Sequence, residues 1–348
     1  MVRIGIVGCN YGRAVQIPAF RLDPRCTIQA IAATDAARAA EAAVASKVPL
    51  SFGNWRELVE HSQVDAVVVA TPPSVQPEIA IHALGLGKPV LVEKPMASDI
   101  AGALSMLRCA NATALPAMID FNFPEILSWR RAKQMLDDGE LGPLRHVFVN
   151  WNVENYATRV RTGWKSAVGQ GGGAMANFVS HCFYYLEWFC GPIEGFSARL
   201  SSLPGEPALD ETTIVLAMDF KSGAKGALCM SSASYLGSGH RLEFYGEEGT
   251  MFLINDGPDY MRGFRLLHAK RPATRLEEIK VTDDLEDKFS DGRVAPESLI
   301  ASRFLDAIEQ GVTAQPDFSA GYRVQWLMDA ARQSHQFGRW IEARQPVV

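Results

Sequence analysis

Short apolar runs alternate with stretches of helical character along the first 120 residues. The apolar runs are rich in β-branched residues and are too short for helices, so we interpret them as buried parallel strands. These runs are 2–7, 27–33, 64–70 and 89–92. Between them, the Ala-rich stretch 36–46 and the stretch 78–86 are typical of helices. Alternating β and α units of this length predict an α/β domain, with an open, doubly wound parallel sheet.

A glycine turn follows the first strand, with the sequence Gly-Cys-Asn-Tyr-Gly-Arg at 8–13. A strand, a glycine turn and a helix leave free backbone N–H groups and the positive end of the helix for a phosphate. Only two glycines are present, and the loop is one residue shorter than G-x-G-x-x-G. Asn stands where the second glycine would be, and Asn tolerates a left-handed backbone. We expect the cofactor phosphates at Gly8, Asn10, Tyr11, Gly12 and Arg13, although this motif alone is equally compatible with an empty turn.

Other polar residues follow the later strands of the expected sheet. Asp35 comes about twenty residues after the turn, where an acid can bind the adenine ribose. Thr71 and Pro72 end the third strand, and Glu93 and Lys94 end the next one. Because ligands bind beyond the carboxyl ends of parallel strands, these turns predict one shared crevice for a dinucleotide.

Composition and charge exclude several other classes of protein. The 348 residues suggest two domains, and a net charge of −5 with mixed signs gives no footprint for nucleic acid or an anionic membrane. None of the six cysteines has zinc-ligand spacing, so we expect free thiols and no metal. No signal peptide is recognisable and the apolar runs are too short to span a bilayer, which favours a cytoplasmic protein.

The order of motifs resembles the glucose–fructose oxidoreductase / inositol dehydrogenase (Gfo/Idh/MocA) family of NAD(P)-dependent oxidoreductases. The resemblance rests on the glycine turn, on Ala-Thr-Pro-Pro at 70–73 and above all on Gly-Lys-Pro-Val-Leu-Val-Glu-Lys-Pro at 87–95. It continues in the glycine-rich segment 170–181 and in the segment 242–250, which resembles a late sheet hairpin of the family. These motifs cover nearly the whole chain.

The resemblance implies a Rossmann domain over 1–120 and an α+β domain with a large, mostly antiparallel sheet over 121–320. It also implies a C-terminal helix in 321–348 that packs back on the first domain. Strand-like stretches fit the second sheet; they are 144–151, 195–200, 212–220, 225–232 and 241–245. The open face of that sheet is often the subunit contact in the family, so a homodimer or homotetramer is expected.

The resemblance also implies the catalytic residues. His181 would be the base that takes the hydroxyl proton, and Lys94 would hold the oxygen or relay the proton. Taken alone, a histidine is more often structural and a lysine is more often a solvated surface charge. Many members have Asp four residues before the histidine, where this chain has Asn177, which cannot accept a proton. Tyr184, three residues after His181, stands where many members have a second acid.

Further candidates have weaker support. Trp164 and Lys165 stand where the family often has Trp-Arg near the cofactor and the substrate. Arg159 and Arg161 could bind an anionic group, and His240 has no motif support. The alternative for Tyr184 and its neighbour Tyr185 is aromatic core packing within 182–189, which the sequence favours.

The choice between NAD and NADP depends on the end of the second strand. With Arg38 as the alignment point, the ribose-binding acid of the family falls at Ala33, and the arginine of some NADP users falls at Thr34. Asp35 gives a slight preference for NAD.

The expected activity is hydride transfer between nicotinamide and a CH–OH carbon of a sugar, cyclitol or sugar nucleotide. Two alternatives remain open. One is a redox-neutral glycosidase with tightly held NAD, and the other is a non-catalytic NAD(P)-binding sensor. Retention of both Lys94 and His181 argues against the sensor.

Overall fold

The computed structural model describes two compact units. The residues described are 1–154, 165, 171–202, 211–282, 285 and 288–344. The first unit contains Met1–Asn122 and Phe289–Gln325, and the second contains Phe123–Lys288 and Trp326–Val348. The expected boundary after residue 120 lies close to the first break. The expectation that the second domain runs on to 320 differs from this division, because residues 289–325 return to the first unit.

The first unit is built on a six-stranded parallel sheet. Its order is β3-β2-β1-β4-β5-β6, and every neighbouring pair is parallel. The strands are β1 (Val2–Val7), β2 (Cys26–Ala32), β3 (Leu50–Phe52), β4 (Ala66–Val69), β5 (Val90–Glu93) and β6 (Ala117–Asp120). This order is that of a doubly wound dinucleotide-binding sheet, as the apolar runs predict.

Helices cover this sheet because its strands are apolar on both faces. The helices of the unit are η1 (Gly12–Gln16), α1 (Ile17–Phe20), α2 (Ala36–Ser46), α3 (Trp55–Glu60), α4 (Gln76–Gly85), α5 (Ile100–Thr113) and α9 (Val294–Gln310). On one face, Ile4, Val68 and Leu91 of the sheet belong to the same buried cluster as Phe20 of α1 and Phe304 of α9. Residues 289–325 therefore return to the first unit because α9 completes its core.

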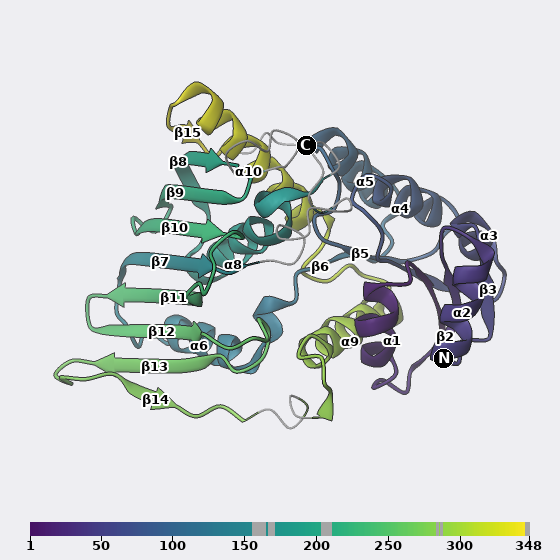
Figure 1. The fold of residues 1–348 in the computed structure, drawn as a ribbon, viewed down its shortest axis with the longest axis horizontal. Helices are drawn as coiled ribbons and strands as arrows, with labels where there is room; N and C mark the ends of the chain where they lie inside the picture. Colours follow the sequence, from purple (N-terminus) through teal and green to yellow (C-terminus); the bar gives the residue numbers. More distant parts are fainter. Residues whose placement is uncertain (155–164, 166–170, 203–210, 283–284, 286–287, 345–348) are drawn as a thin grey trace. The chain divides into compact units, whose positions relative to one another are not determined.

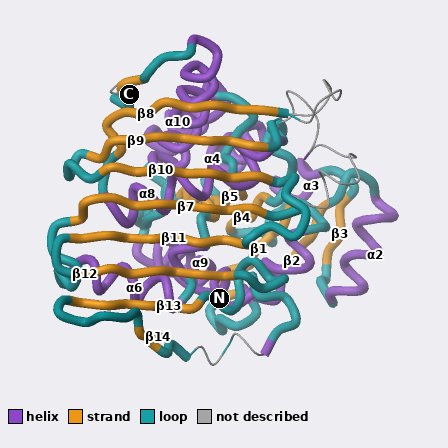
Figure 2. The backbone as a smooth tube through the Cα atoms, turned by 60° about the vertical axis from the view of Figure 1, so that its left-hand side comes forward, coloured by secondary structure: helices purple, strands orange, loops and turns teal. Residues whose placement is uncertain are grey.

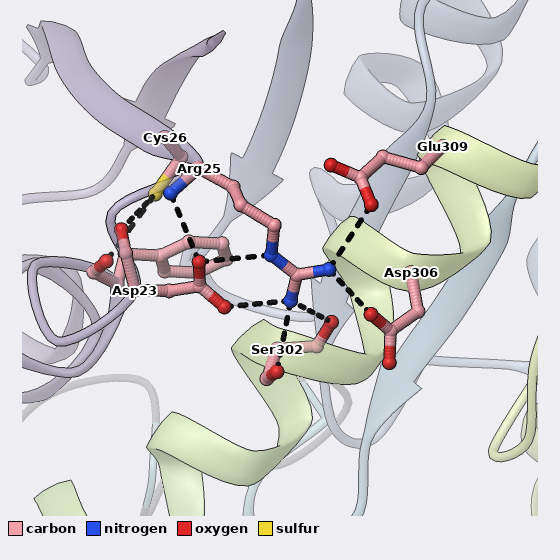
Figure 3. Close-up of polar contacts among 7 residues, drawn as sticks. Asp23, Arg25, Cys26, Ser302, Asp306 and Glu309 are labelled. Atoms are coloured by element: carbon pink, nitrogen blue, oxygen red, sulfur yellow. Dashed lines mark hydrogen bonds and ion pairs between the residues drawn. The ribbon is translucent and has the colours of Figure 1, made fainter.

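Arg25 connects α9 to the loop before β2 (Figure 3). Its guanidinium binds Asp23 at 2.7 Å and Asp306 of α9 at 2.5 Å, and it donates to Ser302 Oγ at 2.9 Å. The same guanidinium lies 3.2 Å from Glu309. One side chain thus joins sequence segments almost 280 residues apart.

The second unit contains a nine-stranded sheet. Its order is β14-β13-β12-β11-β7-β10-β9-β8-β15; only β7 and β10 pair in parallel, and the other pairs are antiparallel. The strands are β7 (Leu144–Asn152), β8 (Ile193–Ser201), β9 (Thr213–Phe220), β10 (Lys225–Ser231), β11 (Gly239–Gly246), β12 (Gly249–Asn255), β13 (Arg265–Lys270), β14 (Glu277–Ile279) and β15 (Ile341–Glu342). The expected fold class, a Rossmann sheet followed by a large and mostly antiparallel sheet, is confirmed.

Helices pack on one face of the larger sheet (Figure 2). They are η2 (Phe123–Glu125), α6 (Leu127–Asp137), η4 (Met175–Val179), α8 (Ser180–Cys190) and α10 (Phe318–Phe337), which begins in the first unit (Figure 1). Val147, Val149 and Trp151 of β7 are buried, whereas Phe148 between them is 40% exposed. This alternation indicates that, among the described residues, the opposite face of the sheet is exposed to solvent at Phe148. No helix among the residues described is long and apolar enough to cross a membrane.

Candidate functional site

The glycine turn after β1 brings three strands together. Gly8 has φ +121°, and a Cβ there would overlap the carbonyl oxygen of Ala70 after β4. The Gly8 N–H donates to Ala32 of β2 at 2.9 Å, and the Ala70 N–H donates to Val7 of β1 at 2.8 Å. Only glycine fits this position, because the backbones of two neighbouring strands approach it closely. The turn therefore has the bare backbone surface at the carboxyl edge of the sheet that a pyrophosphate needs.

Asn10 acts differently from our expectation. Among the described residues, positive φ outside glycine occurs only at three residues, Lys47, Ala114 and Leu236. The left-handed backbone that an Asn would tolerate is therefore not used at Asn10, and the positive φ of this turn lies at Gly8. Instead, Asn10 Oδ1 accepts a hydrogen bond of 2.9 Å from Arg38 Nη2.

Asp35 has a structural partner of its own. It is the N-cap of α2, and its Oδ1 accepts the backbone N–H of Arg38 at 2.8 Å. A cap of this kind satisfies one of the open donors of the first helical turn. Binding of the cofactor ribose by Asp35 stays a prediction, because the capping bond alone accounts for this carboxylate.

The turn that carries Lys94 is held by Gln76, the first residue of α4. Gln76 is fully buried, and its Nε2 donates to the carbonyl of Glu93 at 2.9 Å and to that of Pro95 at 2.7 Å. The same Nε2 lies 3.3 Å from the carbonyl of Met96. One amide therefore fixes the backbone on both sides of Lys94, which is half-buried. Gln76 is not among the residues predicted from the sequence, although it lies only three residues after the predicted loop at 71–73.

A buried polar network connects the ends of β5 and β6 with the glycine turn. Glu93 and Asp120 are register partners at the ends of their strands, and Gln16 Nε2 donates to Glu93 Oε1 at 3.2 Å. Tyr11, within the glycine turn, donates its hydroxyl to Glu297 Oε2 of α9 at 3.2 Å. The structure thus brings Tyr11 and Glu93, both predicted as cofactor contacts, to one edge of the sheet. Thr71 and Pro72 lie on the same edge, directly after β4, and are half-buried.

The second unit places Asn177 and His181 one helical turn apart. Asn177 lies in η4, and its Nδ2 donates to the carbonyl of Gly173 at 2.8 Å and to that of Lys165 at 3.2 Å. His181 is the second residue of α8, is 6% exposed and packs edge-on against Phe123 with ring centroids 4.8 Å apart. Residues four apart share a face of a helix, so the two side chains can act on one group. The amide of Asn177 suits this place because a carboxylate would repel both carbonyls.

The two tyrosines after His181 differ. Tyr185 is fully buried and its hydroxyl lies 2.9 Å from Cys182 Sγ and 3.0 Å from His240 Nε2, which confirms core packing for this residue. Burial raises the pKa of the Cys182 thiol to about 12 and lowers the pKa of His240 to about 3. Tyr184 is half-buried on the same helix, and its role stays a prediction.

His240 is a core residue rather than an isolated histidine. Its ring is stacked on Trp151, with centroids 4.0 Å apart and planes 5° apart. The low pKa keeps the ring neutral, which this stacked and desolvated environment favours.

Some expected site residues cannot be placed. Trp164, Arg159 and Arg161 lie outside the described residues. Lys165 is described, is exposed and contributes its carbonyl to Asn177. The six cysteines are free thiols, and within the described ranges no group of acidic, Cys or His side chains has the arrangement of a metal site.

Comparison with known proteins decides the family. The model of the oxidoreductase family with an NAD-binding Rossmann fold matches residues 2–121, and the model of the GFO/IDH/MocA C-terminal domain matches residues 129–252. An oxidoreductase of Synechocystis sp., itself uncharacterised, is 31% identical over 354 residues, which cover 97% of this chain and 95% of that protein. The chain belongs to the Gfo/Idh/MocA family of oxidoreductases. The resemblance found in the sequence is thereby confirmed.

More distant relatives share the fold of this chain. Levoglucosan dehydrogenase of Pseudarthrobacter phenanthrenivorans is 22% identical over 345 residues, covering 88% of this chain and 87% of that protein. A solved structure of levoglucosan dehydrogenase in complex with NADH has a TM-score of 0.88 at 21% identity, over 99% of this chain and 100% of that one. The WlbA dehydrogenase from Bordetella pertussis, in complex with NADH and UDP-GlcNAcA, has a TM-score of 0.82 at 21% identity, over 100% and 98% of the two chains.

As a Gfo/Idh/MocA oxidoreductase, this chain has an NAD(P)-binding domain whose residues fit a dinucleotide. The dinucleotide would lie against the bare backbone at Gly8 and along the polar edge formed by β1, β4, β5 and β6. The buried residues that support this edge, Gln16, Gln76, Asp120, Asn122 and Glu297, were not found from the sequence. Glu297 lies about 175 positions from Asn122. No local spacing could have indicated that contact.

Proposed function

We propose that this Gfo/Idh/MocA oxidoreductase transfers a hydride between NAD(P) and a secondary alcohol or ketone carbon of a sugar, cyclitol or sugar nucleotide. The observation that carries the proposal is the turn at Lys94. It lies on the same sheet edge as the glycine turn, and the buried Gln76 amide holds it on both sides. A lysine whose backbone is held in this way at the cofactor edge is better suited to a catalytic role than to that of a solvated surface charge.

Each catalytic residue has a role that the chemistry requires. The nicotinamide supplies or accepts the hydride. Oxidation of an alcohol also needs a group that takes the hydroxyl proton, and we assign this role to His181. Lys94 holds the substrate oxygen and stabilises its developing negative charge. Asn177 and Tyr184 bind neighbouring hydroxyl groups.

The cofactor would be held mainly by backbone groups of the glycine turn, at Gly8 and Gly12. Tyr11, Thr71, Pro72, Glu93 and the backbone at Lys94 contribute along the same edge. Trp164 and Lys165, which stand where the family often has Trp-Arg, are the further cofactor contacts that the resemblance implies.

The choice between NAD and NADP depends on the side chains around β2. Arg38 is bound to Asn10, and the Asp35 carboxylate caps α2. Arg13 and Arg38 are both exposed. The capping bond uses one oxygen of Asp35, so the slight preference for NAD stays a prediction, and both dinucleotides must be tested.

The substrate class is supported by what relatives bind. Solved relatives are named as complexes of levoglucosan with NADH and of UDP-GlcNAcA with NADH. Amide, imidazole and phenol groups at Asn177, His181 and Tyr184 suit a ligand rich in hydroxyl groups. A carbohydrate-like small molecule is therefore the proposed partner.

We also propose that the open face of the larger sheet forms a homodimer or homotetramer. An aromatic cluster lies there: the rings of His146 and Tyr245 are stacked 4.6 Å apart, and Phe148 lies 6.2 Å from Tyr245. Val215 on β9 is 47% exposed. Exposed aromatic and apolar side chains that gather on one sheet face are typical of a subunit contact.

Calorimetric titration with NAD+, NADH, NADP+ and NADPH tests the proposal, after a check for cofactor carried through purification. Micromolar binding of one pair is expected, followed by formation or loss of reduced nicotinamide with a sugar, inositol or sugar nucleotide. Bound cofactor without net turnover of it would favour the redox-neutral glycosidase. Binding without any chemistry would favour the sensor, and no binding at all would contradict the proposal.

Replacement of Lys94 separates chemistry from cofactor binding. We expect Lys94→Ala to lower kcat by at least about a thousandfold while dinucleotide affinity changes by about threefold or less, because the lysine acts on the substrate oxygen. Lys225→Ala is the matched control, since that side chain is 66% exposed. Activity of Lys94→Ala within a few fold of wild type would remove Lys94 from the mechanism.

A further inference from the structure

Two carboxyl groups, Asp120 and Glu297, are buried together in the first unit. Asp120, at the end of β6, is 1% exposed, and Glu297, in the first turn of α9, is 0% exposed. The helix α9 packs against β6, and the two carboxyl groups interact with each other directly. Within the described residues neither carboxyl forms an ion pair with a basic side chain. Two ionised carboxylates in this situation would repel each other strongly and would both be desolvated.

A proton shared between the two groups would complete the hydrogen bonds around the pair. Glu297 Oε2 accepts from the Tyr11 hydroxyl at 3.2 Å and from Asn122 Nδ2 at 3.4 Å. Both oxygens of Asp120 and the other oxygen of Glu297 are buried, and no donor from the described residues reaches them. A proton on Glu297 that is donated to Asp120 satisfies oxygens of both groups at once.

The surrounding charges also favour a proton on Glu297. Glu93 on the neighbouring strand adds a further acidic group. Arg293, the residue before α9, is bound by Asp291 at 2.6 Å, and its guanidinium lies over the Tyr11 ring, 5.2 Å from the centroid. Burial and the charge of Asp120 together raise the pKa of Glu297 well above its usual range.

We propose that Asp120 and Glu297 share one proton at neutral pH and act as positioning residues of the dinucleotide site. Glu297 holds Tyr11 of the glycine turn, and Asn122, two residues after β6, donates to the Tyr11 hydroxyl at 3.0 Å. The pair carries a single negative charge at the carboxyl end of β6.

That charge has a consequence for binding, which rests on the proposed function. In a sheet of this order, one mononucleotide half is formed by β1–β3 and the other by β4–β6. The glycine turn and β2 belong to the adenosine half, so β6 belongs to the nicotinamide half. The oxidised nicotinamide ring is cationic and the reduced ring is neutral. The negative charge that the pair adds to this half therefore favours the oxidised form of the cofactor.

Infrared spectroscopy of the protein without cofactor tests the shared proton directly. At pH 7 we expect the carbonyl band of a protonated carboxylic acid, shifted by exchange into D2O and lost in Glu297→Gln. Gln keeps the shape and donates to Asp120 in place of the acid proton. Glu309→Gln, on the exposed end of the same helix, is the matched control and should keep the band. Absence of the band from the wild type, or its full intensity in Glu297→Gln, would overturn the proposal.

The ratio of the Kd values for the reduced and the oxidised cofactor tests the charge. Glu297→Gln keeps the single charge on Asp120, so the ratio should stay within about twofold of the wild type. The double variant Asp120→Asn/Glu297→Gln removes the charge and should weaken the preference for the oxidised form by about three- to tenfold. A wild-type ratio in the folded double variant would refute the role of the charge. If the wild type binds no dinucleotide, the proposed function fails, and the infrared result still decides whether the proton is shared.

Discussion

At the scale of single residues, two buried side chains determine how the cofactor edge is held. Gln76 supplies the donor for the carbonyls on both sides of Lys94, and Glu297 supplies the acceptor for Tyr11. Neither residue is expected to react. Each of them fixes the position of a neighbouring residue. The rate of a reaction is sensitive to small displacements of the groups that take part in it.

Loss of the Gln76 amide should therefore affect kcat more than cofactor binding. Gln76→Leu leaves up to three carbonyls without their donor, which costs about 1–3 kcal/mol of folding stability and frees the Lys94 turn. We expect kcat to fall by about tenfold or more, with the dinucleotide Kd changed by less than about threefold in calorimetry. Gln63→Leu, at an exposed position, is the control. Unchanged kcat in a folded Gln76→Leu variant would show that Lys94 needs no such support.

The raised pKa of Glu297 predicts how stability depends on pH. In the unfolded chain this carboxyl has its ordinary pKa near 4.5, whereas the folded protein keeps the proton to a much higher pH. Its contribution is fully present below about pH 4.5 and is lost as the pH rises toward the folded pKa. Relative to Glu297→Gln, the free energy of unfolding of the wild type should fall as the pH rises above about 4.5, by at most about 1.4 kcal/mol per pH unit.

Urea unfolding of the wild type and of Glu297→Gln at several pH values measures this difference. Glu309→Gln should show no such trend, because that carboxyl is about half exposed. If the free energies of unfolding of the wild type and of Glu297→Gln differ by the same amount at every pH, the raised pKa of Glu297 is contradicted.

At the scale of elements, the helices and strands that depend on a local sequence pattern could be predicted from the sequence. The strand at 2–7 and the helix at 36–46 were placed without error, because apolar runs and an Ala-rich stretch with an Asp cap define them locally. The strand β6 and the helix α9 were missed in the sequence, and both contribute to the polar network. Their contacts join residues far apart along the chain, so no window of sequence contains the signal.

The close approach at the glycine turn gives a prediction for that element. Gly8→Ala should abolish dinucleotide binding or folding of the first unit, because its Cβ would overlap the Ala70 carbonyl. Gly87→Ala is a matched control, since Gly87 has φ +79° and a Cβ there would have no neighbour within 4 Å. It should cost only about 1 kcal/mol, from backbone strain alone. Calorimetry and thermal unfolding of both variants measure the difference, and equal effects would mean that φ, not the close approach, requires glycine at Gly8.

At the scale of the whole molecule, the larger sheet has one covered and one open face. We expect Val215→Glu on the open face to produce monomers, because it places a charge among the exposed apolar groups of β9. Val44→Glu in the first unit is the control, at 81% exposure. Sedimentation velocity measures the oligomeric state. A monomeric wild type, or an assembly unaffected by Val215→Glu, would assign the subunit contact elsewhere.

The return of α9 to the first unit has a consequence for the order in which the chain folds during synthesis. The first 122 residues leave the ribosome without the helix that contributes Phe304 and Glu297 to their core. At about 5–20 residues per second, roughly ten to forty seconds pass before that helix is made. In this interval the nascent sheet exposes an apolar face, so the emerging chain is a natural client for chaperones that bind ribosome-tethered polypeptides. A gene fragment ending near Asn122 should accordingly yield inclusion bodies.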